Sequence, residues 1–176
     1  GRHPDRVVYA RTPEEDVQRR DFTINGLLMR PETGEILDHV GGQADLRAGI
    51  LRAIGEPARR FAEDKLRLLR AVRFAARFAY TIEPATFAAV QRHAPEIVQV
   101  SAERIREELT KLLTEGAARR GFELLEESRL LEGVLPEVAR MRGVEQPPQY
   151  HPEGDVWIHT RMMLDQLPAG ISPTLA

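Results

Sequence analysis

The chain contains no cysteine, which excludes disulfide bonds and metal centres with thiolate ligands. No apolar run approaches the roughly 20 residues that a membrane-spanning helix needs. The first residues, Gly1 to Asp5, do not have the form of a signal peptide. From these absences we expect a cytoplasmic protein with no membrane partner.

Lysine is scarce, because Lys65 and Lys111 are the only lysines among the 25 basic residues. The planar guanidinium of arginine forms paired hydrogen bonds to phosphates and base edges, which a lysine ammonium does not. A GC-rich genome that favours arginine codons is an equally good explanation of the same bias. The net charge of −2 does not favour a nucleic-acid partner by itself, so the argument depends on where the arginines cluster.

Length and composition indicate one or two small domains with real cores. The chain has 176 residues, of which 42% are hydrophobic and 30% charged, as in ordinary soluble globular proteins. Residues 1–55 have a mixed α/β pattern, residues 56–141 a helical one, and residues 142–176 a linker followed by the start of another domain. The predicted fold class is therefore α+β, a mixed α/β part followed by a mostly α-helical part.

The first segment predicts short elements. Residues 7–10 are apolar and favour a strand. Thr12, Pro13 and Glu15 have the form of a helix start that runs towards Arg19. A turn over residues 31–34 between two apolar stretches, residues 24–29 and 35–38, favours a hairpin. A short helix is expected over residues 44–48.

The rest of the chain shows helical periodicity. The expected helices cover residues 59–78, 84–93, 102–113 and 117–128, a shorter stretch from residue 130, and residues 156–167. Proline, glutamine and glycine accumulate between residues 142 and 152, which is typical of a linker.

The first motif is Arg19-Arg20-Asp21-Phe22-Thr23-Ile24-Asn25, where the first helix is expected to end. Arg20 would hold a triphosphate. Asp21 would accept a hydrogen bond from a ribose 2′-hydroxyl, and Asn25 would brace the turn by bonding to backbone. The competing interpretation is a solvated helix end with no ligand.

The second motif is the run E-D-x-x-R-x-x-R-x-x-R-F from Glu63 to Phe74. On one helix, Asp64 and Arg67 would present a joint acceptor and donor edge. Cytosine and adenine match that edge, because each places an exocyclic amine beside an unprotonated ring nitrogen. Uracil and guanine place a carbonyl and an N–H there, and each mismatched contact costs about 1–3 kcal/mol of binding free energy. The competing interpretation is an exposed salt bridge within the helix, which contributes a few tenths of a kcal/mol.

Together the two motifs resemble the class II tRNA nucleotidyltransferases, the family of CCA-adding enzymes and bacterial poly(A) polymerases. The resemblance implies that Asp64 and Arg67 form the protein template for the incoming base and that Arg70 and Arg73 also line the pocket. The D-x-x-G-G-x-x-D-L pattern from Asp38 to Leu46 also resembles this family, and we interpret it as structural, with Asp45 as a cap. The S-x-E-R-I-x-x-E-L pattern from Ser101 to Leu109 resembles the neck motif that buttresses the template helix.

The predicted nucleotide-binding residues are Arg20, Asp21, Asp64, Arg67, Arg70 and Arg73. We predict no catalytic and no metal-binding residue in this chain, because the family's G-G-x-V-R-D and D-x-D carboxylates are absent from it. The resemblance implies Mg²⁺ as cofactor, held by residues missing from this chain. We therefore expect a fragment that lacks the catalytic part of the head and most of an HD-type domain. The expected partners are the 3′ end of tRNA or another RNA, ATP and CTP, and a pairing with a missing catalytic half.

The stretch from His151 to Thr160 resembles the entry to the HD-type domain, with His159 at the position of its first metal histidine. Without partners, a lone histidine is more often a surface or core residue than a ligand. The leading prediction is CCA addition to tRNA. The alternatives are poly(A) addition, which uses the same motifs, a non-catalytic RNA- or nucleotide-binding head–neck module, and, ranked last, an HD phosphohydrolase fragment.

Overall fold

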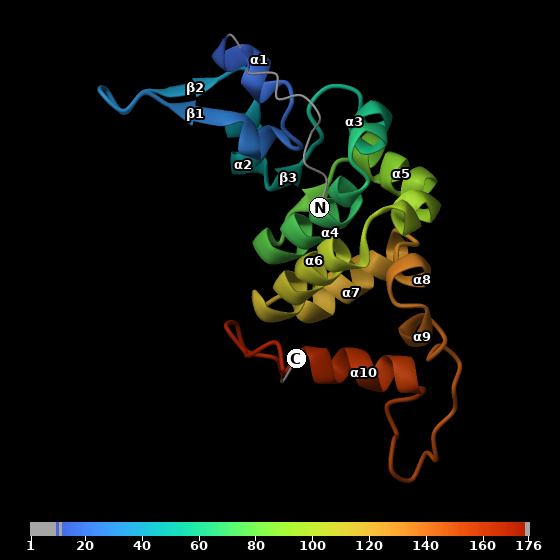
Figure 1. Ribbon diagram of the computed structural model, residues 1–176. Helices are drawn as coiled ribbons and strands as arrows, with labels where there is room; N and C mark the ends of the chain where they lie inside the picture. Colours follow the sequence, from blue (N-terminus) through green and yellow to red (C-terminus); the bar gives the residue numbers. More distant parts are fainter. Residues whose placement is uncertain (1–9, 11, 175–176) are drawn as a thin grey trace.

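The computed structural model describes residue 10 and residues 12–174. A small part with short strands lies at one end, and layers of helices follow it (Figure 1). The α+β fold class predicted from the sequence is confirmed. The strand expected over residues 7–10 lies outside the described residues, apart from Ala10.

The elements follow each other in a simple order along the chain. The α-helices are α1 Pro13–Val17, α2 Gly42–Ala48, α3 Pro57–Glu63, α4 Leu66–Phe78, α5 Pro84–His93, α6 Ala102–Thr114, α7 Ala118–Glu127, α8 Leu131–Val134, α9 Pro136–Ala139 and α10 Val156–Leu164. The strands are β1 Leu27–Met29, β2 Ile36–Asp38, β3 Ile50–Leu51 and β4 Thr81–Ile82, and the 3₁₀ helices are η1 Thr23–Gly26 and η2 Ala94–Gln99.

Helix α1 begins as the sequence predicts. The Thr12 hydroxyl accepts a hydrogen bond from the backbone N–H of Glu15 at 3.2 Å, and Pro13 occupies the first helical position. Proline fits there because it has no N–H group, and an N–H group in the first turn would have no acceptor within the helix. The helix ends at Val17, so Arg19 and Arg20 lie beyond it in the loop.

Strands β1 and β2 form the predicted hairpin. They pair antiparallel, with Leu27 opposite Asp38 and Met29 opposite Ile36. Neither strand has a second partner strand among the described residues. The hairpin therefore presents open edges, which proteins usually cover or pair.

Asp38, and not Asp45, caps helix α2. The Asp38 carboxylate accepts hydrogen bonds from the N–H groups of Gly42 and Gln43, both at 2.9 Å. The free N–H groups of a helix lie in its first turn, and a capping side chain precedes them. Asp45 comes too late for that role. It is instead 7% exposed and accepts a hydrogen bond from the Thr23 hydroxyl at 2.7 Å.

The single helix predicted over residues 59–78 is wrong, because the chain breaks between α3 and α4. Asp64 has the extended backbone angles φ −148° and ψ 108°. Its carboxylate accepts a hydrogen bond from the N–H of Leu66 at 3.1 Å. An aspartate side chain that bonds nearby backbone offers the chain an alternative to the helical ladder. Asp64 therefore lies just before α4 and does not share a helix face with Arg67.

Helix α4 is the centre of the core. It packs against α6 and α7, while α3 packs against α5 (Figure 1). Leu68, Leu69 and Val72 of α4 are at most 1% exposed, and full burial of such a side chain stabilises a fold by about 1.5–3 kcal/mol. The helical spacing that predicted α4 thus corresponds to its buried face.

Two short β contacts hold the first part of the chain against α4. Strand β3 pairs in parallel with β4, which follows α4, with Ile50 opposite Thr81. Phe22 forms an isolated antiparallel bridge with Ala53 and is completely buried. These contacts place the loop of the first motif beside the helix of the second.

The last part of the chain is irregular between α9 and α10, as predicted. Trp157 of α10 is 4% exposed, and its indole N–H donates to the Glu126 carboxylate of α7 at 3.0 Å. Met162 and Met163 of the same helix are about half exposed, at 48% and 56%. Within the described part of the chain, none of the helices has the length and apolar character needed to span a membrane.

Candidate nucleotide-binding site

The two sequence motifs meet at a pocket of about 590 Å³. Its walls come from the loop after α1, the α3–α4 junction, the first turns of α4 and the start of α6. The lining residues are Arg20, Asp21, Asn25, Asp64, Leu66, Arg67, Arg70, Phe74 and Arg104. Five of the six predicted nucleotide-binding residues are therefore brought together.

Arg20 is held at one wall by short-range contacts. Its guanidinium donates to the Asp16 carboxylate at 2.8 Å and to the backbone carbonyl of Asn25 at 2.8 Å. The Arg20 side chain is still 37% exposed. A partly exposed guanidinium at a pocket wall is suited to bind an anionic group.

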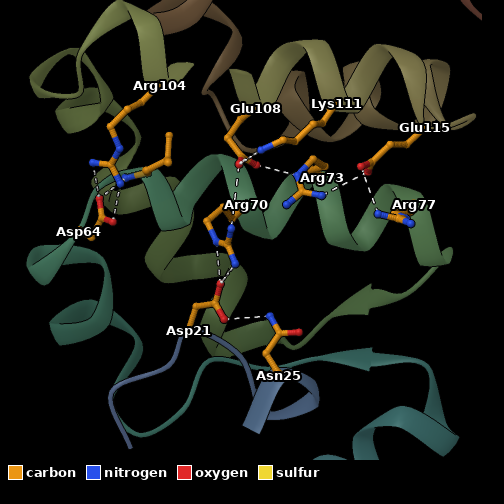
Figure 2. Close-up of polar contacts among 11 residues, drawn as sticks. Asp21, Asn25, Asp64, Arg70, Arg73, Arg77, Arg104, Glu108, Lys111 and Glu115 are labelled. Carbon is orange, nitrogen blue, oxygen red and sulfur yellow. Dashed lines mark hydrogen bonds and ion pairs between the residues drawn. The ribbon is translucent and has the colours of Figure 1, made fainter. Parts of the chain in front are cut away.

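Asp21 forms the link between the loop and α4, as Figure 2 shows. One carboxylate oxygen accepts from Arg70 Nε at 2.7 Å, and the other accepts from the Asn25 side-chain amide at 2.9 Å. Asp21 is 7% exposed, and its pair with Arg70 satisfies a buried charge. Asn25 thus braces the turn through the Asp21 carboxylate, and the expected side-chain bond to backbone is not the contact observed.

Asp64 is held from a third element, helix α6. Arg104 donates to both carboxylate oxygens, at 3.2 and 2.8 Å (Figure 2). Partial burial works to raise the pKa of the Asp64 carboxyl. The hydrogen bonds from Arg104 and from the Leu66 N–H, and the positive charges of Arg104 and Arg67, outweigh that effect and lower the pKa below its ordinary 3.8. The carboxylate is therefore kept in its charged, accepting form.

Arg67 is largely engaged with backbone. It donates to the carbonyl oxygen of Arg19 at 2.9 Å and to that of Arg60 at 3.2 Å. It also contacts the Glu63 carboxylate at 3.1 Å. The joint edge of Asp64 and Arg67 towards a base stays a prediction, because both side chains line the pocket. The guanidinium that contacts the Asp64 carboxylate belongs to Arg104.

The expectation that Arg73 lines the pocket does not agree with the structure. Arg73 is 6% exposed and points between α4 and α6. There it donates to Glu108 at 2.6 Å and to Glu115 at 3.2 Å. A side chain three residues further along a helix points about 60° away from the first, because three residues fall short of a full turn. This takes Arg73 off the face that carries Arg70.

Four lining residues were not predicted as nucleotide-binding residues, namely Asn25, which was expected only to brace the turn, Leu66, Phe74 and Arg104. Leu66 and Phe74 belong to the second motif but carry no charge that would single them out. Arg104 belongs to the S-x-E-R pattern, which predicted only a buttress. It lies 40 residues from Asp64 in sequence, so only folding shows that the two side chains meet.

His159 is not alone, contrary to the expectation of a histidine without partners. His151, Glu153 and His159 place one potential ligand atom each within 4.8 Å of one another. Hydrogen bonds from its own backbone N–H, His159 and His151 lower the pKa of Glu153 to about 2. A charged carboxylate between two imidazole rings explains why the three side chains gather.

Two family descriptions and several known proteins match this chain. The description "Poly A polymerase head domain" matches residues 1–52, and "Probable RNA and SrmB-binding site of polymerase A" matches residues 79–141. The multifunctional CCA protein of Nitrosomonas eutropha is 47% identical over 165 residues, which is 90% of this chain and 39% of that protein. The CCA-adding enzyme of Leuconostoc mesenteroides is 45% identical over 123 residues, 70% of this chain and 30% of that protein.

The chain belongs to the family of CCA-adding enzymes and poly(A) polymerases. The CCA-adding enzyme of Bacillus stearothermophilus, solved in complex with CTP, is 39% identical with a TM-score of 0.70. That match covers 77% of this chain and 35% of the other. A CCA-adding enzyme solved in complex with ATP is 30% identical with a TM-score of 0.65, over 70% of this chain and 30% of the other.

The curated relatives in this nucleotidyltransferase family are longer than the chain. It spans about two fifths of their length for the multifunctional CCA proteins and 30% for the Leuconostoc enzyme. The two family matches cover the part with the short strands and the helical part from residue 79 onwards, and the second motif lies between them.

Proposed function

We propose that this chain supplies the nucleotide-selecting and RNA-binding part of an enzyme that adds CCA to the 3′ end of tRNA from CTP and ATP. One observation carries the proposal: the loop with Arg20 and Asp21 and the junction with Asp64 enclose a single pocket. Its volume of about 590 Å³ lies within the range of small-molecule sites. Relatives named as CCA-adding enzymes, and solved with CTP and with ATP, support the same function.

The proposed roles follow from the contacts of each side chain. Arg20, at the exposed wall, binds the triphosphate. Asp64 accepts a hydrogen bond from the exocyclic amine of cytosine or adenine, which its low pKa favours because the carboxylate stays charged. Arg67 donates to the adjacent ring nitrogen. Its guanidinium has five N–H donors, and its contacts with Arg60, Glu63 and Arg19 use three of them.

Asp21 and Arg70 complete the proposed pocket. Asp21 is almost buried and bonded through both oxygens, so a ribose 2′-hydroxyl would share the carboxylate with Arg70. Arg70 is 32% exposed and remains near enough to contact the nucleotide. Arg73 acts in this proposal only indirectly, by fixing α4 against α6.

Metal-dependent transfer requires carboxylates with oxygens free to hold Mg²⁺ near the phosphates. The carboxylates that line the pocket, within the described part of the chain, are Asp21 and Asp64, and each is bonded to an arginine. This donor set does not fit a Mg²⁺ site, and we derive no step through the metal. We propose that Mg²⁺ is held by carboxylates other than those of this pocket.

Poly(A) addition is the second candidate, because both matching family descriptions name poly(A) polymerase. A non-catalytic nucleotide- and RNA-binding module is the third. The deciding experiment incubates the full-length polypeptide with tRNA lacking its CCA end and with radiolabelled CTP and ATP, separately and together. Addition of C residues followed by one A supports CCA addition, long A tracts from ATP alone support poly(A) addition, and binding without transfer supports the module.

The 176-residue chain by itself is expected to transfer no nucleotide, because no carboxylate pair of its pocket fits two Mg²⁺ ions. The measurement is incorporation of labelled AMP into tRNA under the conditions used for the full-length polypeptide. Incorporation by the 176-residue chain would show that carboxylates described here do hold the metal.

A further inference from the structure

A ladder of aromatic rings runs out of the pocket along α4. Phe22 packs edge-on against Phe74 with ring centroids 6.0 Å apart. Phe74 lies parallel to Phe78 at 5.9 Å with an interplanar angle of 4°, and Phe78 contacts Tyr80 at 5.6 Å. The spacing of four residues places Phe74 and Phe78 on the same helix face.

Exposure increases along this ladder from Phe22 to Phe78. Phe22 is completely buried, Phe74 is half-buried at the pocket wall, and Phe78 is 42% exposed. The ladder therefore begins in the candidate nucleotide site and ends at the surface. At 42% exposure, the Phe78 ring leaves apolar surface accessible to a partner at the end of this row.

Arginine side chains accompany the rings. The guanidinium of Arg73 lies 4.3 Å from the Phe74 ring centroid, and that of Arg77 lies 5.5 Å from the Phe78 centroid. Arg77 is 45% exposed and paired with Glu115 at 3.1 Å. The combination of an open ring and an adjacent, partly exposed guanidinium offers a stacking face together with a phosphate contact.

The backbone holds the end of the ladder in place. Ala79 ends α4 in the left-handed conformation, at φ 54°, which is unusual for a residue other than glycine. The turn brings Tyr80 beside Phe78, and the Tyr80 hydroxyl donates to the carbonyl of Leu46 at 3.2 Å. Phe78 thus packs against Phe74 and Tyr80 and is still 42% exposed.

We propose that Phe78, with Arg77, forms a stacking site for an unpaired base at the 3′ end of the RNA acceptor. This inference rests on the proposed function and names where the acceptor strand approaches the nucleotide pocket. The occupant is single-stranded RNA, because its unpaired bases expose π faces and its phosphates complement Arg77. Phe74 packs against Phe78 and also lines the pocket, so it connects the stacked base to the site where the new nucleotide binds.

A stacking face also suits the reaction. After each addition the acceptor ends in a new nucleotide, so a contact that reads one base edge would fail at the next step. Every base has a π face, so stacking tolerates the change. Phe74 and Phe78 carry no hydrogen-bonding side-chain group that would select one base, whereas the charged groups that select are gathered around Asp64.

The test compares Phe78→Leu, Phe78→Trp and Tyr150→Leu in the full-length polypeptide. Tyr150 is a matched control, because it is an aromatic residue 73% exposed in the irregular segment before α10. Binding is measured with a single-stranded RNA that carries 2-aminopurine at its 3′ end, whose fluorescence falls on stacking. KM values for the RNA acceptor and for CTP are measured in parallel.

Phe78→Leu is expected to weaken acceptor binding about tenfold, to abolish the fluorescence quenching, and to leave the KM for CTP within about twofold. Phe78→Trp is expected to retain both binding and quenching, and Tyr150→Leu to behave as wild type. Unchanged acceptor affinity in Phe78→Leu would overturn the proposal. An equal rise of both KM values would also overturn it, by showing a general effect on the pocket.

Thermal unfolding separates stacking from packing. Since Phe78 is exposed, Phe78→Leu is expected to shift the Tm by no more than a degree or two. A fall of several degrees with unchanged acceptor affinity would show that protein covers this ring, and the inference would be wrong. If wild type transfers no nucleotide but still quenches the RNA probe through Phe78, the proposed function fails and the stacking site stands.

Discussion

Arg104 places two guanidinium nitrogens on the two carboxylate oxygens of Asp64, at 3.2 and 2.8 Å, across 40 residues of chain. The pair joins the start of α6 to the α3–α4 junction (Figure 2). It keeps Asp64 charged and orients its oxygens towards the pocket. The acceptor that is proposed to read the base is therefore set by a helix outside both of the main sequence motifs.

Replacing Arg104 is expected to raise the pKa of Asp64. In the folded chain this pKa is lowered, so the pair contributes stability above the ordinary value of 3.8 and loses it as the pH falls through the folded pKa. In Arg104→Gln the partial burial of the carboxyl, which raises the pKa, is less opposed. The measurement is an NMR titration of the Asp64 side chain.

The matched control is Arg106→Gln, because Arg106 is an exposed arginine on the same helix. It is expected to leave the Asp64 titration as in wild type. An unchanged Asp64 pKa in Arg104→Gln, or an equal rise in both variants, would show that the pair does not set the charge of Asp64.

Asp64→Ala is expected to relax base selection. The carboxylate attracts an exocyclic amine and repels a carbonyl, so its loss should reduce discrimination against UTP and GTP by about 10- to 100-fold in relative kcat/KM, or about 1–3 kcal/mol. The four nucleotides are compared with tRNA acceptor and the full-length polypeptide.

Arg20→Ala is the counterpart in the same assay. Since phosphates carry no base identity, it should lower kcat/KM for all four nucleotides alike. If Asp64→Ala lowered every nucleotide equally and kept their ratios, Asp64 would be a structural brace and not a reader of the base.

Asp21→Asn is expected to destabilise the fold by about 1–3 kcal/mol, because a charge-assisted bond to Arg70 becomes a neutral one and the guanidinium loses the negative charge of Asp21. Urea denaturation measures the free energy of unfolding. Asp16→Asn removes an exposed pair with Arg20 and should cost less than about 1 kcal/mol. Equal losses in both variants would argue against the Asp21–Arg70 link between the loop and α4.

Gly42→Ala is expected to destabilise the start of α2. A Cβ at Gly42 would lie 2.2 Å from the backbone carbonyl oxygen of Thr23, a distance that backbone movement must relieve at a cost of about 1–3 kcal/mol or more. Arg47→Ala, at an exposed position of the same helix, is the control and should change stability by less than about 0.5 kcal/mol. A neutral effect of Gly42→Ala on urea unfolding would show that the start of α2 adapts freely.

By itself, the sequence determined the elements whose signals are local. Thr12 starts α1 because its side chain accepts a hydrogen bond from a free N–H group of the first turn, and Pro13 fits there because it has no N–H group. Pro84 fits the start of α5 for the same reason as Pro13. The periodicity of α4 identified its buried face. The two motifs also determined the family, because their residue types and spacing are specific.

Only the tertiary structure decided which charges meet. Arg67 lies three residues from Asp64, but it bonds backbone carbonyls of α3 and of the loop before Phe22, whereas Arg104 contacts the carboxylate from α6. Arg73, expected in the pocket, is buried against Glu108. Sequence spacing gives the neighbours of a residue along one helix. A long arginine side chain, however, bonds to the acceptors that other elements bring within its reach. Those acceptors are determined by how segments far apart in the chain pack together.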